Sequence, residues 1–525
     1  MENRSLYGGH PMLTALVGLL ITVLLVAVAK RRTRNRMPPG PWGWPVLGCI
    51  PRLGRLPHQS LAKFARKYGP LMSIKLGSAN VVVVSSPKMA EEFLRNHDKI
   101  WASRFAPIAA KIVGYNGNDI LFSEYGPRWR YARKIFMLEL LTAKRISTFQ
   151  AARKQEISRG IIEALSISQN GTQPVRMVRI LANIAGNIIT RMMMNEGSLG
   201  DKAAKSANSD DFHKALKDGL GVVTNFYLGD YVPWLDRFCS KKQMYAVAKE
   251  IDQVFQAILD DHKLKLGTDP GQCETVATDQ NKVQGIVDVL LTRPRDVDGQ
   301  YLTEMEMKAI ILDVFFGGVE PNTIALEWGL SELLRNPHVM EKAQAEMDSM
   351  VGRERLVEES DLPNLPYLNA IVKETFRLHP IAALLPAHMS MEDCEIQGYQ
   401  IPANTRLLVN VHAIQRDPGV YERPLDFYPE RFLGSEKDVH GLDFDLLPFG
   451  SGRRMCPGKG LGLVVVQYTM ALFIQCCNLK LPGNMEPEEL DMEERFGLTT
   501  PRLNCLQVVV TPRLPRGKLM GEEET

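Results

Sequence analysis

The stretch Pro448–Gly460, PFGSGRRMCPGKG, decides the fold, because it places one cysteine in a glycine-rich, doubly basic loop just before an apolar, helix-forming run. Gly450 and Gly452 let backbone N–H groups turn inward, and Arg454 adds positive charge beside the sulfur of Cys456. A position near a helix N-terminus also favours a thiolate over a thiol. A cysteine taken alone is more often a buried structural residue, but a thiolate held in this way is a good axial ligand for iron.

The overall composition is that of an ordinary globular protein. The 525 residues are 45% hydrophobic and 23% charged, with a formal net charge of +3. Residues 1–36 carry a net charge of +5, which leaves −2 for the rest of the chain, so nucleic-acid binding loses its electrostatic support and no nucleic-acid partner is expected. The eight cysteines form no CxxC pair, which favours reduced thiols in a cytosol-facing protein.

The N-terminal region predicts a single membrane anchor. The uncharged run Met12–Ala29 would span ~27 Å as a helix, and the basic cluster Lys30–Arg36 follows it directly. Positive charge on the downstream side keeps the rest of the chain in the cytoplasm, and a cleaved signal peptide would carry its charge before the apolar run. Residues 1–36 are therefore predicted to be an anchor with a stop-transfer flank.

The remainder, residues 37–525, is predicted to be one large domain that starts with a stiff Pro/Gly hinge over residues 37–48. Helical periodicity dominates it, and the fold class is mainly α (α+β) with small β-sheets. The expected strands are Leu71–Leu76, Asn80–Ser85 and Thr405–Val411. The expected helices are Lys88–Asn96, Lys144–Leu165, Lys242–Leu266, Glu304–Arg335, Pro337–Val351, Pro366–Leu378 and Leu461–Cys477, and Gly267–Lys282 is expected to be a surface loop.

The pattern Phe449-x-x-Gly452-x-Arg454-x-Cys456-x-Gly458 resembles the haem-binding signature of the cytochrome P450 family. The resemblance implies the P450 fold and a haem b whose iron is bound by Cys456, the only metal ligand expected from the protein.

Further motifs of the family follow at the appropriate spacing. Glu374 and Arg377 resemble its ExxR pair, and Arg431 lies in a segment that resembles its PERF element. Positions i and i+3 share a helix face, so Glu374 and Arg377 can jointly hold Arg431 in a buried charge network. Without the other motifs, an ExxR sequence would be an ordinary surface ion pair.

The resemblance also implies the residues around the haem edge. Trp129 and Arg133 resemble the family's WxxxR pair that grips a haem propionate, Arg454 resembles a second propionate partner, and His388 occupies a place where related plant enzymes have Arg or His. The cofactor-binding set also includes Phe449 and Gly458. Because the chain has no dinucleotide fingerprint or flavin module, the implied electron donor is the NADPH-cytochrome P450 reductase of the endoplasmic reticulum membrane, with O2 as co-substrate.

The segment Glu304–Arg335 resembles the helix that crosses the distal haem face. Gly317, Gly318 and Glu320 fit the family pattern, but Pro321 stands where the family has an alcohol. The alcohol matters because it positions the water that delivers protons to bound oxygen. Thr323 is rotated by about 200° and cannot replace it from the same face, although Glu320 or a substrate hydroxyl could still supply protons.

Pro321 supports two interpretations. It lacks an N–H and clashes with the preceding turn, so it should kink the helix over the iron. In an ordinary hydroxylase it would be a tolerated variation. Plant P450s that couple two phenols within one alkaloid molecule resemble this sequence in having proline there, and in their chemistry each phenol loses hydrogen, the carbon radicals join, and no oxygen enters the product.

The N-terminal third resembles the plant flavonoid 3',5'-hydroxylase group, and Ile381–Leu385 is more apolar than is usual there. The main prediction is NADPH- and O2-dependent intramolecular carbon–carbon phenol coupling of an isoquinoline-type alkaloid, a phenethylisoquinoline of the colchicine route being one such substrate. The alternative is ring hydroxylation of a flavonoid or phenylpropanoid. A haem carrier without catalysis, or a peroxide-rearranging relative, fits the motifs less well. The expected small aromatic substrate would contact Phe105, Ile108, Ile120, Phe316, Val319, Ala382 and Leu384.

Overall fold

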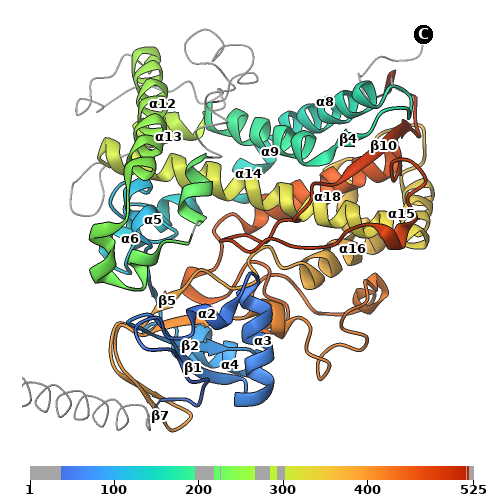
Figure 1. Cartoon of the computed structure of the whole chain (residues 1–525). Coiled ribbons are helices and arrows are strands. Elements are labelled where there is room, and N and C mark those ends of the chain that lie inside the picture. The colour runs from blue at the N-terminus through green and yellow to red at the C-terminus, as the bar shows by residue number, and fades with distance from the viewer. Residues whose placement is uncertain are drawn as a thin grey trace, which may run out of the picture.

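The computed structural model describes residues 37–194, 218–224, 226–266, 284–292, 302–515 and 517–518. Figure 1 shows a small sheet region near the start of the chain and a larger helical region crossed by one long helix, α14. The predicted anchor Met12–Ala29 and the predicted loop Gly267–Lys282 lie outside the described residues. The hinge, residues 37–48, contains only turns and isolated bridges, as its prolines and glycines predict.

In the described residues, helices make up most of the secondary structure and the strands are short. The helices are α2 (Ile50–Leu53), α3 (Pro57–Tyr68), α4 (Pro87–Glu91), α5 (Ile108–Val113), α6 (Pro127–Ile135), α7 (Ala143–Thr148), α8 (Gln150–Ser168), α9 (Met177–Met194), α12 (Lys242–Leu266), α13 (Ile286–Thr292), α14 (Glu304–Arg335), α15 (Pro337–Met350), α16 (Pro366–Leu378), α17 (Val411–Ile414) and α18 (Lys459–Cys476). Short π turns are η1 (Glu92–Asn96) and η2 (Phe136–Leu140), and short 3-10 turns are η4 (Leu228–Asp230), η5 (Pro233–Phe238), η6 (Glu359–Asn364), η7 (Pro429–Phe432), η8 (Gly452–Arg454) and η9 (Pro487–Glu489). The strands are β1 (Leu71–Leu76), β2 (Ala79–Val84), β3 (Ser103–Arg104), β4 (Val175–Arg176), β5 (His388–Met389), β6 (Cys394–Ile396), β7 (Tyr399–Ile401), β8 (Arg406–Val409), β9 (Cys477–Lys480) and β10 (Gln507–Pro512).

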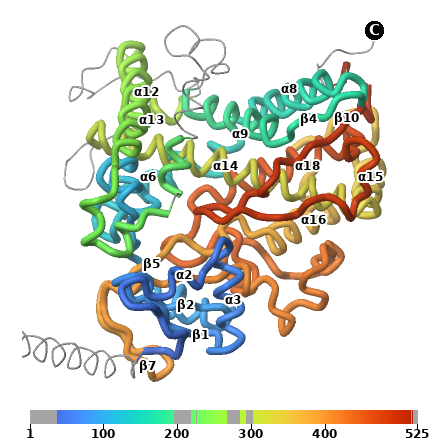
Figure 2. Tube along the Cα trace, in the orientation of Figure 1, coloured from blue at the N-terminus to red at the C-terminus, as the bar shows by residue number. Residues whose placement is uncertain are grey.

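The largest sheet has the order β1-β2-β8-β5-β3 and joins segments from both halves of the chain. Figure 2 traces these distant segments side by side, with β1 and β2 in blue beside the orange region near residue 400. The valines of β2 alternate between two cores: Val82 and Val84 pack in one cluster, and Val81 and Val83 in another. Both faces of this strand are therefore buried, which explains the unbroken apolar run NVVVV.

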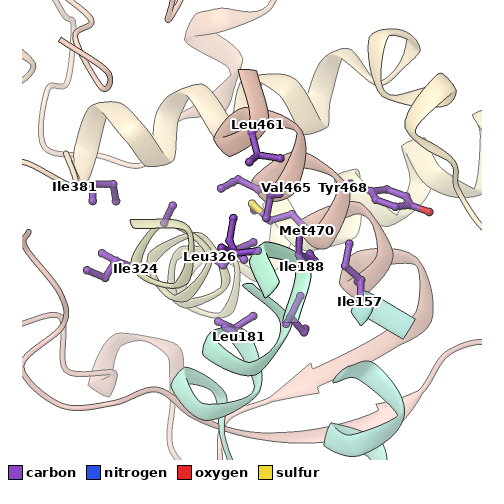
Figure 3. Packing of buried hydrophobic residues seen from close by; sticks show 14 of the residues in the cluster. Ile157, Leu181, Ile188, Ile324, Leu326, Ile381, Leu461, Val465, Tyr468 and Met470 are labelled. Atoms are coloured by element: carbon purple, nitrogen blue, oxygen red, sulfur yellow. The ribbon is translucent and has the colours of Figure 1, made fainter. Parts of the chain in front are cut away.

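Helix α14 begins with a capping box, in which Thr303 and Glu306 satisfy each other's backbone N–H groups. It packs against α9 on one side and α16 and α18 on the other. Figure 3 shows Leu181 and Ile188 of α9 meeting Leu326 of α14, with Val465 and Met470 of α18 close by. Among the described helices, α14 and α18 are long and apolar enough to cross a membrane, but 67% of each apolar window is buried within this core.

Candidate functional site

The loop that carries Cys456 has the backbone that its glycines predict. Gly450 and Gly452 have φ angles of +67° and +71°, which residues with a side chain rarely adopt. A Cβ on Gly452 would lie 2.3 Å from the carbonyl oxygen of Leu94, so this position also requires the absence of a side chain. The Cys456 N–H donates to the Phe449 carbonyl oxygen at 2.9 Å, and α18 starts three residues later.

The pKa of the Cys456 thiol is raised, although the sequence predicted that the loop and the helix end would lower it. Burial raises the pKa of the thiol, and the Gly458 N–H and the charges of Arg133 and Lys459 lower it by a smaller amount. The loop and the helix end alone therefore do not favour the thiolate over the thiol, because the desolvation of a buried sulfur outweighs them. A bound metal ion would supply the missing stabilisation of the thiolate, since a coordinating thiol loses its proton.

The cationic edge of the site is built around Arg454. Its guanidinium donates to the carbonyl oxygens of Ala102 at 2.5 Å, Ile120 at 3.1 Å and Ser123 at 2.6 Å. It also stacks over the Trp129 ring at 4.2 Å, and burial lowers its pKa to about 10. Arg454 thus stays a cation at neutral pH.

Two neighbours complete this edge. Trp129 donates its ring N–H to the Ile120 carbonyl oxygen at 3.1 Å, and Arg133 donates to the Met455 carbonyl oxygen at 2.6 Å. Both side chains line the cavity next to Cys456. The structure therefore brings these sequence-predicted residues together at one edge.

His388 and Arg104 face the same edge from paired strands. They are opposite each other in the β3–β5 register, and both line the cavity. His388 Nδ1 lies 2.8 Å from the Trp101 carbonyl oxygen and must donate to it, so its Nε2 can donate to a carboxylate only when the ring is protonated. Burial and the charges of Arg104 and Arg454 hold the pKa of His388 well below its usual value. Arg104, which the sequence reasoning missed, keeps a buried Nε–H without a partner and is the readier donor.

Glu374, Arg377 and Arg431 form one buried network. Arg377 donates to both Glu374 carboxylate oxygens, at 2.6 and 2.8 Å, and Arg431 donates to one of them at 3.0 Å. The Glu374 and Arg377 side chains are fully buried. The remaining N–H groups of Arg377 donate to the carbonyl oxygens of Gln415, Pro424 and Asp426. The network therefore fixes the chain that leads to the cysteine loop.

The opposite wall of the cavity is α14. Gly317, Gly318, Glu320 and Pro321 all line it. A Cβ on Gly317 would meet nothing within 4 Å, whereas a Cβ on Gly318 would lie 2.4 Å from Cδ1 of Ile189 on α9. Gly317 thus keeps the cavity open, and Gly318 lets α9 and α14 approach each other.

Pro321 lies within α14 without ending it, since the helix continues to Arg335. Proline has no N–H, so the Gly317 carbonyl oxygen lacks its usual donor from four residues later. Thr323 donates its hydroxyl to the Val319 carbonyl oxygen at 2.8 Å, and the residue does not line the cavity. The nearest alcohol on the helix is thus bound back into the helix and does not replace the missing one.

Glu320 is the titratable residue next to Pro321. Burial raises the pKa of its carboxyl group, and a hydrogen bond from the Thr499 hydroxyl and the charge of Arg495 oppose that rise. Thr499 lines the same cavity. Glu320 and Thr499 therefore form a pair that can hold and pass a proton at the cavity wall.

The expected substrate contacts fall into two groups. Ile120, Phe316 and Ala382 line the cavity, whereas Phe105, Ile108, Val319 and Leu384 do not. The first two have other contacts: Arg406 lies over the Phe105 ring at 3.3 Å, and Ile108 packs against the main hydrophobic core.

The other two face elsewhere for reasons of geometry. Val319 is about 200° around α14 from Gly317. Leu384 bridges to Asn410 and packs with the β1–β2 core, which leaves the neighbouring Leu385 to line the cavity.

Sequence reasoning also missed several cavity residues from distant segments. They are Arg104, Phe122, Leu220, Val223, Leu498 and Thr499. Asp119 and Asp313 line the cavity as well, and Asp313 is recognisable in the sequence because it interrupts the apolar run IILDVFFGG. A charged residue on the cavity-facing side of a helix in such a run needs an explanation.

The residues that line the cavity suit a haem. A flat macrocycle needs a thiolate on one face, space on the other, and cations for its two carboxylates. Cys456 supplies the first, the open side of Gly317 the second, and Arg104, Arg133 and Arg454 the third. The unpartnered Arg104 Nε–H is a ready donor for a carboxylate. The fold and the cavity thus define a haem-thiolate protein.

Comparison with known proteins agrees with this class. The sequence profile described as "Cytochrome P450" matches residues 38–506. The chain is 38% identical over 514 residues to the flavonoid 3'-monooxygenase of Arabidopsis thaliana, covering 96% of this chain and 97% of that one. It is 36% identical over 513 residues to a flavonoid 3',5'-hydroxylase of Solanum melongena, covering 96% of each. A solved zebra fish cytochrome P450 with progesterone matches with a TM-score of 0.72 at 25% identity, covering 87% of this chain and 99% of that one.

The chain belongs to the cytochrome P450 family. The predicted fold, mainly helical with small sheets, is confirmed, and so is the resemblance to plant flavonoid hydroxylases. The protein is a haem-thiolate monooxygenase of the P450 type, which depends on O2 and on electrons from NADPH delivered by a reductase.

Proposed function

We propose that this P450 joins two phenol rings within one isoquinoline-type alkaloid molecule. The observation that carries the proposal is Pro321, which lines the cavity where an alcohol would position a proton-carrying water, while Thr323 is bound back into its helix. Coupling balances as substrate, O2, NADPH and H⁺ giving the coupled product, two H2O and NADP⁺. Phenethylisoquinolines of the colchicine route are among the substrates that fit this chemistry.

The residues of the chain support such a reaction in stated ways. Cys456 would bind the iron, and Arg104, Arg133 and Arg454 would hold the carboxylates of the haem. When bound, the haem supplies the oxidation of the phenols at the expense of O2. Glu320, hydrogen-bonded to Thr499, can hold a proton at the cavity wall. Apolar side chains such as Phe316, Ala382 and Leu385 orient aromatic rings and exclude water.

A second candidate is hydroxylation of a flavonoid or phenylpropanoid ring. The comparisons favour this candidate, because relatives of 36–38% identity over nearly the whole chain are named as flavonoid hydroxylases. Here Pro321 would be a tolerated variation, and Glu320 alone would serve proton delivery. One oxygen atom of O2 would enter the product and the other would leave as water.

We also propose the cellular setting. The run Met12–Ala29 and its basic flank would anchor the chain in the endoplasmic reticulum membrane with residues 37–525 in the cytosol. The NADPH-cytochrome P450 reductase of that membrane would be the electron donor. Removal of residues 1–36 should release the protein from the membrane fraction, and unchanged membrane association would contradict the anchor.

One experiment separates the two reactions. Microsomes that contain the full chain, reductase and NADPH are given a diphenolic phenethylisoquinoline or a flavanone under ¹⁸O₂. Mass spectrometry then measures the mass and the ¹⁸O content of the products. A product two hydrogens lighter and free of label supports coupling. A product with one labelled oxygen refutes coupling and supports hydroxylation. Cys456→Ser, which should lose the CO absorbance band of a haem thiolate, is the control for haem-independent oxidation.

A further inference from the structure

Besides the arginines of the haem edge and Glu320, two aspartates lie in the wall of the largely apolar cavity. Asp313 belongs to α14, and Asp119 belongs to the segment that leads to α6. Asp313 precedes Gly317 by four residues, so both face the cavity from one side of the helix, ~6 Å apart along its axis. Neither aspartate belongs to the haem-binding or proton-carrying groups described above.

The two carboxyl groups are held next to each other. Asp313 Oδ2 accepts the Ile120 N–H at 2.6 Å, and Ile120 directly follows Asp119 in the chain. Asp119 Oδ1 accepts the Phe122 N–H at 2.5 Å. Asp119 is only 4% exposed, and its Oδ2 is buried without a hydrogen-bond partner. The pair thus holds a free acceptor at the cavity wall.

The pair lacks a counter-ion from the protein. In the part of the chain that the structure describes, no Lys, Arg or His forms an ion pair with either aspartate. The charge of Arg454 lowers the pKa of Asp119, but Arg454 forms no ion pair with it. Three of the five N–H groups of Arg454 donate to backbone carbonyl groups, and the other two are those assigned to a haem carboxylate.

The electrostatics show what such a pair requires. Burial raises the pKa of Asp119 to about 6, and burial and the charge of Asp119 raise the pKa of Asp313 well above its usual value. Two such carboxyl groups cannot both ionise in an apolar cavity unless a cation joins them.

We propose that Asp313 and Asp119 bind the ammonium group of a cationic amine substrate while an aromatic ring of that substrate lies over Gly317. An ammonium group supplies both the positive charge and the N–H donors that the pair lacks. The positions of Asp313, Gly317 and Pro321 along α14 fit an amine whose reacting ring lies about 6–12 Å from its nitrogen. This inference rests on the proposed alkaloid chemistry and names its recognition site.

The test is a binding titration that needs no turnover. Full-length enzyme in microsomes is titrated with 1-(4-hydroxyphenethyl)-tetrahydroisoquinoline, which is protonated at neutral pH, and with its uncharged N-acetyl derivative, and the shift of the haem absorbance gives each Kd. We expect Asp313→Asn to weaken binding of the amine at least tenfold and that of the N-acetyl compound less than twofold. Asparagine keeps an oxygen to accept the Ile120 N–H, so the hydrogen bond between α14 and the segment around Ile120 remains.

Asp119→Asn gives a second, independent variant with the same expected selectivity. Asp230→Asn is the matched control, because Asp230 also accepts a backbone N–H, from Ile108, but does not line the cavity. It should change both Kd values less than twofold. The CO absorbance band of each variant establishes that it is folded and holds haem.

Four outcomes would overturn the proposal: no binding of the amine by the wild type, no change in Kd for both variants, equal weakening for both ligands, or a spectrum showing the nitrogen bound to iron. Equal weakening would mean that the aspartates only tie the cavity wall together. The outcome is distinct from that of the ¹⁸O experiment, because charge-selective binding can be present whether the product is coupled or hydroxylated.

Discussion

Replacing Pro321 with threonine tests the role of the distal helix most directly. A proline inside a helix costs ~3 kcal/mol relative to alanine, and threonine costs up to ~0.7 kcal/mol, so Pro321→Thr should stabilise the fold by about 2 kcal/mol. With an unfolding entropy of ~2.1 cal/mol/K per residue, a body of about 490 residues gains roughly 1 °C per kcal/mol. We therefore expect the haem-thiolate CO band to be lost about 2 °C higher than in the wild type.

The same variant should alter the chemistry. A hydroxyl at residue 321 would restore a group that positions a proton-carrying water, so the fraction of product that carries one ¹⁸O atom should rise. Pro321→Ala is the matched control, because it restores the N–H to the Gly317 carbonyl oxygen without a hydroxyl. Both variants should gain thermal stability, but only the threonine variant should change the product ratio.

Two results would refute this reasoning. If neither variant raised the midpoint, the helix would have already accommodated the proline through other contacts. If the alanine and threonine variants changed the product ratio equally, the effect would come from the shape of the helix and not from the hydroxyl group.

Three further predictions concern other parts of the site. Glu374→Gln should destabilise the fold by ~3–5 kcal/mol, because it leaves Arg377 and Arg431 buried beside a neutral partner, and a CO-band midpoint within 1 °C of the wild type would contradict this. Thr499→Val should move the alkaline limb of the pH–rate profile to higher pH by up to about one unit. The Thr499 hydroxyl lowers the pKa of Glu320, and Glu320 delivers a proton only while its carboxyl group is protonated. An unmoved profile would exclude Glu320 as the titrating group. Gly318→Ala should lower the free energy of unfolding by ~1–3 kcal/mol in thermal denaturation, because its Cβ would meet Ile189. Gly317→Ala should leave stability intact and weaken ligand binding. The reverse pattern would show that Gly317 does not face the cavity and that Gly318 does not face α9.

Local patterns predicted much of the fold. The bounds of α12, α14 and α16 agree with the expected ranges, because long apolar periodicity, the Thr303 capping box and prolines next to helix ends are signals within the segment itself. β1 also agrees, and β2 is displaced by one residue. The expected helix Lys144–Leu165 is instead two helices, α7 and α8, separated at Phe149. Thr142 caps the start of α7, and α8 begins directly after Phe149.

The site could be predicted only where residues lie in short motifs. The cysteine loop and the Glu374–Arg377 pair depend on spacing within one segment, so the sequence sufficed to bring them together. Leu384 and Leu385 could not be separated, because which of two neighbours faces the cavity depends on a bridge to Asn410 in a distant segment. Arg104 was missed for the same reason, since only the pairing of β3 with β5 brings it beside His388.

The hydrogen bonds of Arg377 fix the number of residues in the segment that surrounds it. All five N–H groups of its guanidinium are used, two by Glu374 and three by the carbonyl oxygens of Gln415, Pro424 and Asp426. A segment with one residue added or removed between Gln415 and Asp426 would leave a charged N–H buried without an acceptor. Chimeras that exchange this segment with a relative should therefore succeed only when its length is kept, even if every residue that touches the haem is unchanged.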